Sequence, residues 1–363
     1  MKKRVLLINF GGPRNPAEIE KFLWDVLSDP FVFDVPLPEF FRLKLAKFIT
    51  KRRTPEVAKS YLKMGFGGGS PLVPETEKQA KTLETLLKSK TGEDWSVDIA
   101  MTAGYPNLRD MEKSRLIPSQ DNILLPLFPH FSRSTVLSVV NIIEQIIGTD
   151  PRKEPGWIGP FYKEPSYLQA ATQLILDYFY GKLVKNFIQL NRKEPIEDWQ
   201  NLTLVYSAHG IPMRLIKKGD TYVQELEDCR AKITTNLRKA GFMGRDYLSF
   251  QSRVGKGKWT EPNTIDMLKQ LGNEGVKRVA IIPISFVSDH LETLFEIGEE
   301  LKEIAHKNGI IEYYRVPASG IYPMFIETLA KLVMAVPFDY AQGTHDYDKR
   351  KHNSDIERSR NVP

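Results

Sequence analysis

RVAIIPISFVSDHLETLFEIGEE, residues 278–300, runs from an apolar strand through a polar strand end into a helical pattern. His290 and Glu292 follow the apolar run, and Glu296 and Glu300 continue the acidic series at intervals of four. Side chains four residues apart share one face of an α-helix, where like charges repel each other. Cations, shared protons or solvation must offset that repulsion. The segment is therefore either a solvated acidic helix face or a path for metal ions or protons.

The same succession of strand and helix repeats along the chain. Short apolar runs predict strands at residues 4–10, 96–101, 122–128, 202–208, 247–252, 278–286 and 311–317. Helical spacing predicts helices at residues 17–28, 75–91, 133–147, 222–240, 262–273, 290–306 and 323–335. Strands that alternate with helices form parallel sheets with helices on both faces, so the predicted fold class is α/β.

A weak internal repeat indicates two domains. VLLINFGGP near residue 5 is echoed by TLVYSAHGIP near residue 203, and ILLPLFPHFS near residue 123 by AIIPISFVSD near residue 280. Residues 149–165 contain several prolines and glycines, which mark a boundary. We expect an N-terminal domain over residues 1–160, a C-terminal domain over 161–336 and a disordered tail over 337–363.

The composition is that of a globular protein, with 41% hydrophobic and 26% charged residues among 363. No run reaches the ~18 apolar residues that span a bilayer, and the start does not resemble a signal peptide, so we expect a cytoplasmic protein. The single cysteine, Cys229, argues against a disulfide within the chain and against a cysteine-ligated zinc or iron–sulfur site. We expect it to be a surface thiol. The net charge of +6 comes without a nucleic-acid-binding motif, so no nucleic acid partner is expected.

Residues 30–53, which we call the apolar lip, combine five phenylalanines with a basic end. The prolines predict a loop that leads into an amphipathic helix. Such a segment covers a pocket, contacts a membrane surface or packs into the core, and the residues leave these alternatives open.

Polar residues follow several predicted strands. In an open α/β sheet, ligands bind beyond the carboxyl ends of the strands. This rule brings residues 9–13, 129–132, 207–212, 251–257 and 285–292 to one cleft. His209 directly follows an apolar strand and precedes a Gly-Ile-Pro turn, so it is a candidate functional residue. The chain has no GxGxxG, Walker A, GxSxG or HExxH motif, which argues against a nucleotide site, a serine nucleophile or a resident catalytic zinc.

Seven strings carry a resemblance to a known family. LINFGGP, FITKRRTPEV, GGGSP, PHFS, YSAHGIP, FQSRVGKGKWTEP and PISFVSDHLETLFEI, in this order, resemble ferrochelatase, which inserts ferrous iron into a porphyrin. The resemblance implies two Rossmann-like domains with a porphyrin cleft between them, which the apolar lip closes. It also implies a C-terminal helix that packs back toward the first domain.

The resemblance assigns roles position by position. His209 and Glu292 match the active-site histidine and glutamate, so they are the expected catalytic and metal-binding residues. The expected proton or metal path comprises Asp289, His290, Glu296 and Glu300. The expected porphyrin-binding residues are Phe10, Arg53, Tyr61, Ser70, His130, Ser132, Trp259 and Phe286.

The implied function is a lyase reaction, the insertion of Fe²⁺ into protoporphyrin IX with release of two protons, which is the final step of heme biosynthesis. Alternatives are a coproporphyrin ferrochelatase, another type II metal chelatase, or a non-catalytic tetrapyrrole carrier, which would not need both a histidine and the acidic series. The expected partners are porphyrin and Fe²⁺, and Fe²⁺ is a substrate. No cofactor and no iron–sulfur cluster is expected. The expected location is cytoplasmic, with peripheral contact at the inner face of the membrane as a further alternative.

Overall fold

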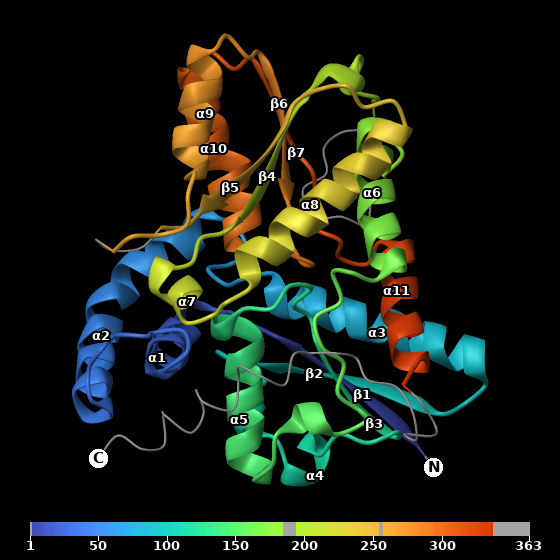
Figure 1. The fold of residues 1–363 in the computed structure, drawn as a ribbon. Helices are drawn as coiled ribbons and strands as arrows, with labels where there is room; N and C mark the ends of the chain where they lie inside the picture. Colours follow the sequence, from blue (N-terminus) through green and yellow to red (C-terminus); the bar gives the residue numbers. More distant parts are fainter. Residues whose placement is uncertain (1, 184–193, 254–256, 337–363) are drawn as a thin grey trace.

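The chain forms two parallel β-sheets surrounded by helices (Figure 1). The structure is a computed structural model, and it describes residues 2–183, 194–253 and 257–336. The predicted tail over residues 337–363 lies outside the described residues. The first sheet has the order β2-β1-β3 and the second the order β5-β4-β6-β7, with every neighbouring pair parallel. The strands are β1 Lys3–Asn9, β2 Trp95–Met101, β3 Asn122–Pro126, β4 Thr203–His209, β5 Asp246–Gln251, β6 Arg278–Pro283 and β7 Glu312–Arg315. All seven predicted strands and the α/β class are confirmed.

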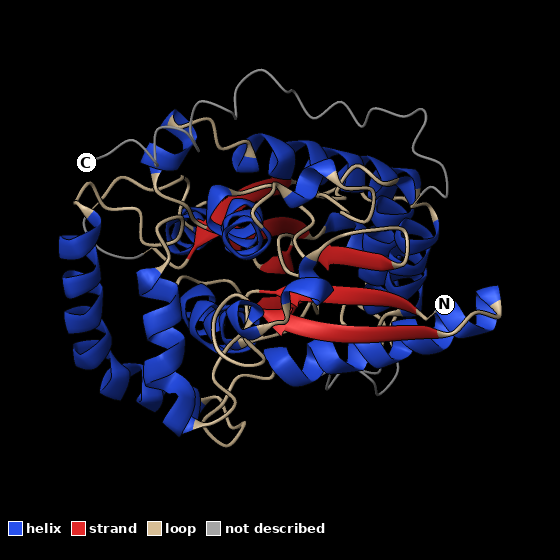
Figure 2. Cartoon of the chain, turned by 90° about the horizontal axis from the view of Figure 1, so that it is seen from below, coloured by secondary structure: helices blue, strands red, loops and turns tan. Residues whose placement is uncertain are grey.

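Eleven α-helices are described within these ranges, together with 3₁₀-helical and π-helical segments. Figure 2 shows the helices around the strands. The α-helices are α1 Ile19–Ser28, α2 Glu39–Lys63, α3 Leu72–Thr91, α4 Lys113–Leu116, α5 Ser138–Ile147, α6 Pro165–Phe179, α7 Met213–Lys217, α8 Tyr222–Lys239, α9 Thr264–Asn273, α10 Leu301–Lys307 and α11 Pro323–Met334. The 3₁₀ helices are η1 Pro16–Glu18, η2 Leu108–Asp110, η4 Pro151–Lys153 and η5 Trp199–Asn201. Two segments are π-helical, η3 Arg133–Leu137 and η6 Glu292–Glu300.

The central strand β1 is buried on both faces, which explains its apolar run from Val5 to Ile8. Successive strand residues point to opposite faces. Val5 and Leu7 of β1 therefore pack in one cluster with Leu83 of α3. Leu6 and Ile8 point to the other face and pack in a second cluster with α5. The cluster that contains Leu7 also includes Tyr206 of β4, so one continuous core joins the two sheets.

The two-domain division stays a prediction, although all strands of the first sheet precede residue 127 and all strands of the second follow residue 202. Helix α11 packs on α6 and also on α3, as the resemblance implied (Figure 1). An ion pair between Lys90 Nζ and Glu327 Oε2, at 3.0 Å, also joins α3 and α11 at the surface. The C-terminal helix therefore ties the two sheets together.

Two helices differ from the sequence prediction. Helix α2 continues ten residues beyond the predicted end of the apolar lip at residue 53, with Pro55 inside it. Helix α6 was not predicted at all. It packs against α8 and α11, and nine of its fifteen residues are buried. A helix buried on two sides lacks a broad polar face, so its periodicity is weak.

The acidic series at residues 292–300 lies on a π-helix rather than the predicted α-helix. A π-helix has i→i+5 hydrogen bonds and a wider turn, so residues four apart do not stay aligned over two turns. Glu292 and Glu296 are half-buried, whereas Glu300 is exposed. The prediction that Glu292, Glu296 and Glu300 share one helix face is therefore wrong for Glu300.

The prediction that Cys229 is a surface thiol is also wrong. The side chain is buried on the core face of α8, between Leu226 and Ile233 in the three-to-four-residue spacing of the helix's apolar stripe. A cysteine without a charged partner behaves as a small apolar residue, which explains the position.

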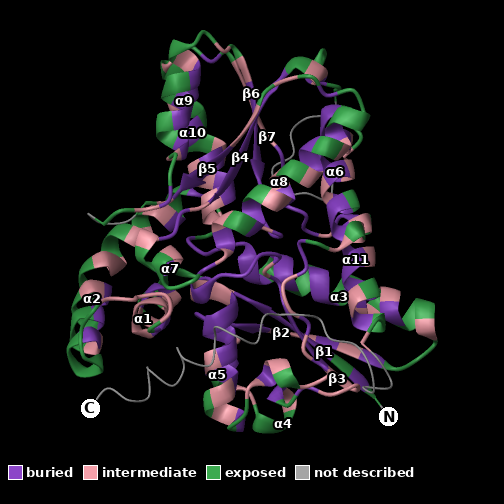
Figure 3. Cartoon of the chain, in the orientation of Figure 1, coloured by how far each residue is buried: buried purple, intermediate pink, exposed green. Residues whose placement is uncertain are grey.

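Much of helix α2 is exposed to solvent (Figure 3). Phe40, Phe41 and Phe48 are 61%, 58% and 62% exposed. The alternative in which the apolar lip packs into the core is therefore wrong for these three residues. Among the described residues, the helices are all too short or too polar to cross a membrane.

Candidate active site

His209 and Glu292 form the closest pair of functional groups predicted from the sequence. His209 is the last residue of β4, and Glu292 is the first residue of η6. The strand end and the helix start meet because β4 pairs with β6, whose carboxyl end leads into η6. The His209 Nδ1 and Glu292 Oε2 atoms lie 2.7 Å apart. The structure thus brings together the two residues that the resemblance assigned to catalysis.

The Glu292 carboxylate changes the acid–base properties of His209. Burial alone lowers the pKa of His209, but the charge and hydrogen bond of Glu292 outweigh it and raise the pKa above its usual value. The histidine side chain is 41% exposed, so it remains open to a ligand. When Nδ1 donates to the carboxylate, Nε2 carries the lone pair of the neutral ring. The arrangement gives His209 one nitrogen that can accept a proton.

Glu292 is surrounded by hydrogen-bond donors. Its Oε2 accepts from Gln251 Nε2 at 3.3 Å and from Ser252 Oγ at 3.0 Å, and its Oε1 lies 3.6 Å from His290 Nε2. Burial raises the pKa of Glu292, but His209 and His290 outweigh that effect and hold it well below the usual value. The pKa of His290 is raised in turn, because Glu292 offsets the effect of burial. Glu292 is thus held as an anion beside two histidines.

Glu296 is the second carboxylate of this group. Ser252 Oγ lies 2.5 Å from Glu296 Oε2. Burial and the charge of Glu292 raise the pKa of Glu296 to about 7. Two neighbouring carboxylates whose pKa values are pushed in opposite directions are typical of a site that handles protons.

Two members of the predicted path are not part of this group. Asp289 is buried, and its Oδ1 accepts from Arg315 Nη1 at 2.9 Å. That contact turns the carboxylate toward β7. Glu300 is exposed at the end of η6. The structure therefore gathers His290 and Glu296, but not Asp289 or Glu300, around Glu292.

Aromatic side chains lie beside the acidic group. Tyr61 of α2 packs in an apolar cluster with Leu294 of η6, so the N-terminal part of the chain reaches the π-helix. Burial, together with the charges of Glu292 and Glu296, raises the pKa of Tyr61. The Phe286 ring centroid lies 4.8 Å from that of His290. Tyr61 and Phe286 thus adjoin the group from two sides.

The remaining predicted porphyrin residues are spread more widely. Phe10 packs edge to face on Phe22, with 6.4 Å between ring centroids. Ser70 lies in the loop before α3, and its amide donates to Pro13 O at 2.6 Å. Trp259 forms an isolated bridge with Pro212, just beyond β4. Arg53 is half-buried on α2.

The PHFS segment is buried against α8. Ser132 Oγ donates to Asp220 Oδ2 at 3.1 Å. The His130 ring stacks on Tyr162 with 5.3 Å between centroids. Among the residues that the structure describes, neither ring nitrogen of His130 has a hydrogen-bond partner, and burial lowers its pKa to about 3. The structure thus describes a neutral His130 inside the protein rather than on an open surface.

Gln251 and Ser252 are further candidate site residues, which the sequence prediction did not single out. Both contact Glu292, and both lie at the carboxyl end of β5. Their position in the polar strand end at residues 251–257 was a usable signal, but no residue type singled them out. The structure places both residues in the candidate site, because their side chains donate hydrogen bonds to Glu292.

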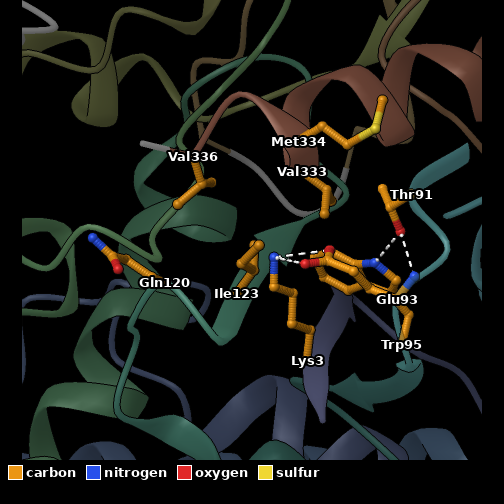
Figure 4. Close-up of a pocket in the computed structure, with 9 residues that line it drawn as sticks. All are labelled: Lys3, Thr91, Glu93, Trp95, Gln120, Ile123, Val333, Met334 and Val336. Carbon is orange, nitrogen blue, oxygen red and sulfur yellow. Dashed lines mark hydrogen bonds and ion pairs between the residues drawn. The ribbon is translucent and has the colours of Figure 1, made fainter. Parts of the chain in front are cut away.

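A cavity of about 160 Å³ lies elsewhere, at the amino ends of the first sheet (Figure 4). It is lined by Lys3, Thr91, Glu93, Trp95, Gln120, Ile123, Val333, Met334 and Val336. Its polar groups bind one another: Lys3 Nζ lies 2.8 Å from Glu93 Oε2, and Trp95 Nε1 donates to Thr91 Oγ1. None of the predicted site residues lines this cavity. Within the described ranges, no cluster of three or more His, Cys, Asp or Glu residues is arranged to hold a metal ion.

Comparison with known proteins identifies the family. The family model described as Ferrochelatase matches residues 2–336. The chain is 54% identical to "Ferrochelatase" of Leptospira borgpetersenii over 92% of this chain and 91% of the relative. It is 51% identical to "Ferrochelatase" of Leptospira biflexa, with the same coverage, and 37% identical to that of a Nostoc species over 91% of this chain and 81% of the relative. The chain belongs to the ferrochelatase family and is an enzyme that inserts iron into a porphyrin.

Proposed function

We propose that this enzyme inserts Fe²⁺ into protoporphyrin IX, forming protoheme and releasing two protons, with His209 and Glu292 as the reacting centre. The observation that carries the proposal is the 2.7 Å contact between His209 Nδ1 and Glu292 Oε2 at the carboxyl end of a parallel strand. A porphyrin loses two pyrrole protons as it gains a divalent ion, so the site needs a base and a group that meets the metal.

The residues at this centre suit both tasks. The Nε2 atom of His209 accepts a pyrrole proton when Nδ1 donates to Glu292. Imidazole and carboxylate also bind ferrous iron without the tight hold of several thiolates, so the ion is released to the ring. We propose that the proton or metal path consists of His290 and Glu296, which lie beside Glu292. Asp289 is engaged by Arg315, and we assign it a structural role.

The porphyrin is proposed to lie against the aromatic residues beside this group. Tyr61 packs with Leu294 of η6, Phe286 packs with His290, and Phe10 packs with Phe22 just beyond the end of β1. A rigid aromatic pocket that bends the macrocycle would expose its nitrogen lone pairs to the ion. Arg53, Ser70 and Trp259 are proposed to contact the edges of the macrocycle, and His130 and Ser132 to support the facing wall.

The apolar lip favours protoporphyrin over the more carboxylated coproporphyrin. Phe40, Phe41 and Phe48 present an exposed apolar surface, and Lys44 Nζ lies 4.2 Å from the Phe40 ring centroid. An apolar surface bordered by lysines is also suited to anionic lipids. We therefore propose a cytoplasmic enzyme with peripheral contact at the inner face of the membrane.

A metallation assay tests the substrate proposal. Purified protein receives Fe²⁺ under anaerobic conditions with protoporphyrin IX or coproporphyrin, and absorbance follows insertion. We expect a higher kcat/KM for protoporphyrin IX. A higher value for coproporphyrin would overturn the substrate assignment, and porphyrin binding without insertion of iron would support the carrier alternative.

A further inference from the structure

We propose that the cavity at the amino ends of the first sheet is the docking site of the chain's own next segment, residues 337–340, with the Phe338 ring inside it. This segment, Pro-Phe-Asp-Tyr, follows the last described residue. The expected disordered tail would then begin after residue 340. Docking there does not depend on the reaction at His209 and Glu292.

The cavity lies where four elements of the described structure meet (Figure 4). Lys3 comes from β1, Trp95 from β2, Ile123 from β3 and Val333 from α11. The end of a helix therefore covers the amino ends of all three strands. The volume is about 160 Å³, and an apolar cavity of about 150 Å³ holds one benzene ring. The space thus suits a single phenyl ring.

The lining of the cavity favours an apolar occupant. The side chains of Trp95, Ile123 and Val333 are buried. Lys3 Nζ lies 2.7 Å from Glu93 Oε1, so a charged ligand would have to compete with an existing ion pair. Lys3 Nζ also lies 5.3 Å from the Trp95 ring centroid. An ammonium group in that position can attract a second aromatic ring by the same cation–π interaction.

The described part of the chain ends at this cavity. Helix α11 ends at Met334, and the amide of Val336 donates to Val333 O at 3.3 Å. Val336 itself lines the cavity. Pro337 has no amide hydrogen and cannot continue the helix, so the chain must turn there. Because two residues span at most about 7 Å, Phe338 is within reach of the space.

A tether this short favours the chain's own segment over a separate partner. A group on a short flexible linker has an effective concentration in the millimolar range. A second copy of the chain would instead lose translational and rotational freedom on binding. One phenyl ring buries roughly 150–250 Å², far below the roughly 1,200 Å² of a stable interface between proteins. The intramolecular occupant is therefore the one that the cavity can hold.

Docking of Phe338 would fasten the end of α11 to the first sheet. Helix α11 packs on both α6 and α3, and its last residue, Met334, is 40% exposed. A ring in the cavity would contact Val333 of this helix together with Trp95 and Ile123 of the sheet. The segment would thus add to the contacts by which the C-terminal helix joins the two sheets.

The NMR signal of the Trp95 indole N–H tests docking in the full chain. Trp95→Phe identifies this signal among those of the five tryptophans, because it removes one peak. Phe338→Leu should shift the signal, since leucine fills the cavity but has no ring current. Tyr347→Ser removes an aromatic residue further along the same tail and is the matched control, which should leave the signal in place. An unshifted Trp95 signal in Phe338→Leu would overturn the docking.

Thermal unfolding provides a second measurement. Phe338→Ser removes the apolar ring and should lower the Tm by about 2–5 °C, whereas Phe338→Leu should lower it by less. Tyr347→Ser should leave the Tm unchanged. A Tm for Phe338→Ser equal to that of the wild type would contradict the docking. A Trp95 signal that moves with protein concentration would assign the cavity to a second copy of the chain and would also overturn the proposal.

Discussion

His209 and Glu292 are separated by 83 positions in the sequence, yet their Nδ1 and Oε2 atoms lie 2.7 Å apart. This contact raises the pKa of the imidazole and lowers that of the carboxylate. Each residue therefore depends on the other for its ionisation state. The effect of this contact on the two pKa values can be measured separately from turnover.

Glu292→Gln should lower the pKa of His209. The amide keeps the shape of the side chain but removes the negative charge, so burial becomes the dominant effect on the imidazole. NMR titration of the histidine ring protons in both proteins measures the change. An unchanged or higher pKa in the variant would show that Glu292 is not the charge that His209 senses.

The same variant should alter the pH dependence of the free energy of unfolding. The contribution of His209, whose pKa is raised in the folded state, is present at low pH and is lost as pH rises through that value. The contribution of Glu292, whose pKa is lowered, is lost as pH falls through its folded value. The free energy of unfolding of the wild type should therefore exceed that of Glu292→Gln by most at pH values between these two folded-state pKa values. Denaturant unfolding at several pH values measures it, and a constant difference across pH would contradict the ion pair.

Glu296→Gln should change the pH profile of iron insertion. Glu296 must be ionised to accept a proton, and its pKa is raised to about 7. The insertion rate of the wild type should therefore fall as pH falls through about 7. The variant should be slow throughout, without that transition. An identical transition in the variant would assign it to another group.

Cys229 should not react with a thiol reagent in the folded protein. Its side chain is fully buried in α8, and burial raises the pKa of the thiol. Reaction should begin only with denaturant. Cys229→Ser should lower the free energy of unfolding by about 1–3 kcal/mol, because it buries a hydroxyl. Rapid labelling of the native protein would contradict the buried position.

Replacement of Phe40, Phe41 and Phe48 by serine should weaken binding to anionic lipid vesicles. These side chains are 61%, 58% and 62% exposed, so the change removes apolar surface with little effect on the core. Ile311→Ser, at a side chain 68% exposed beside β7, is the matched control. Vesicle co-sedimentation measures binding. Equal binding by the triple variant, or none by the wild type, would contradict the membrane contact.

The sequence was sufficient to predict the strands and the central pair. His209 and Glu292 are both polar residues that follow apolar runs, and parallel pairing brings such strand ends together. The left-handed backbone of Ser252 was not predictable, because contacts from distant segments maintain it and no local residue type signals it. The regular spacing of the glutamates suits an α-helix as well as a π-helix, so it could not reveal that Glu300 lies outside the group.

Buried helices were predicted less well than amphipathic ones. Helix α6 has apolar residues on both of its packed sides, which weakens the periodicity that identifies a helix. Cys229 was misplaced for a related reason: the many charged residues of α8 concealed which residues form its apolar stripe. In both cases the partner helix determines burial, and a single sequence does not identify that partner.

Single-turnover insertion of Fe²⁺ into bound protoporphyrin IX by Glu292→Gln and His209→Ala tests the central claim most directly. Anaerobic stopped-flow absorbance measures insertion, and porphyrin fluorescence measures the Kd beforehand. The proposed centre predicts that both variants bind porphyrin with nearly the wild-type Kd and insert iron at least about a hundredfold more slowly. Insertion at the wild-type rate by either variant would contradict the role of that residue.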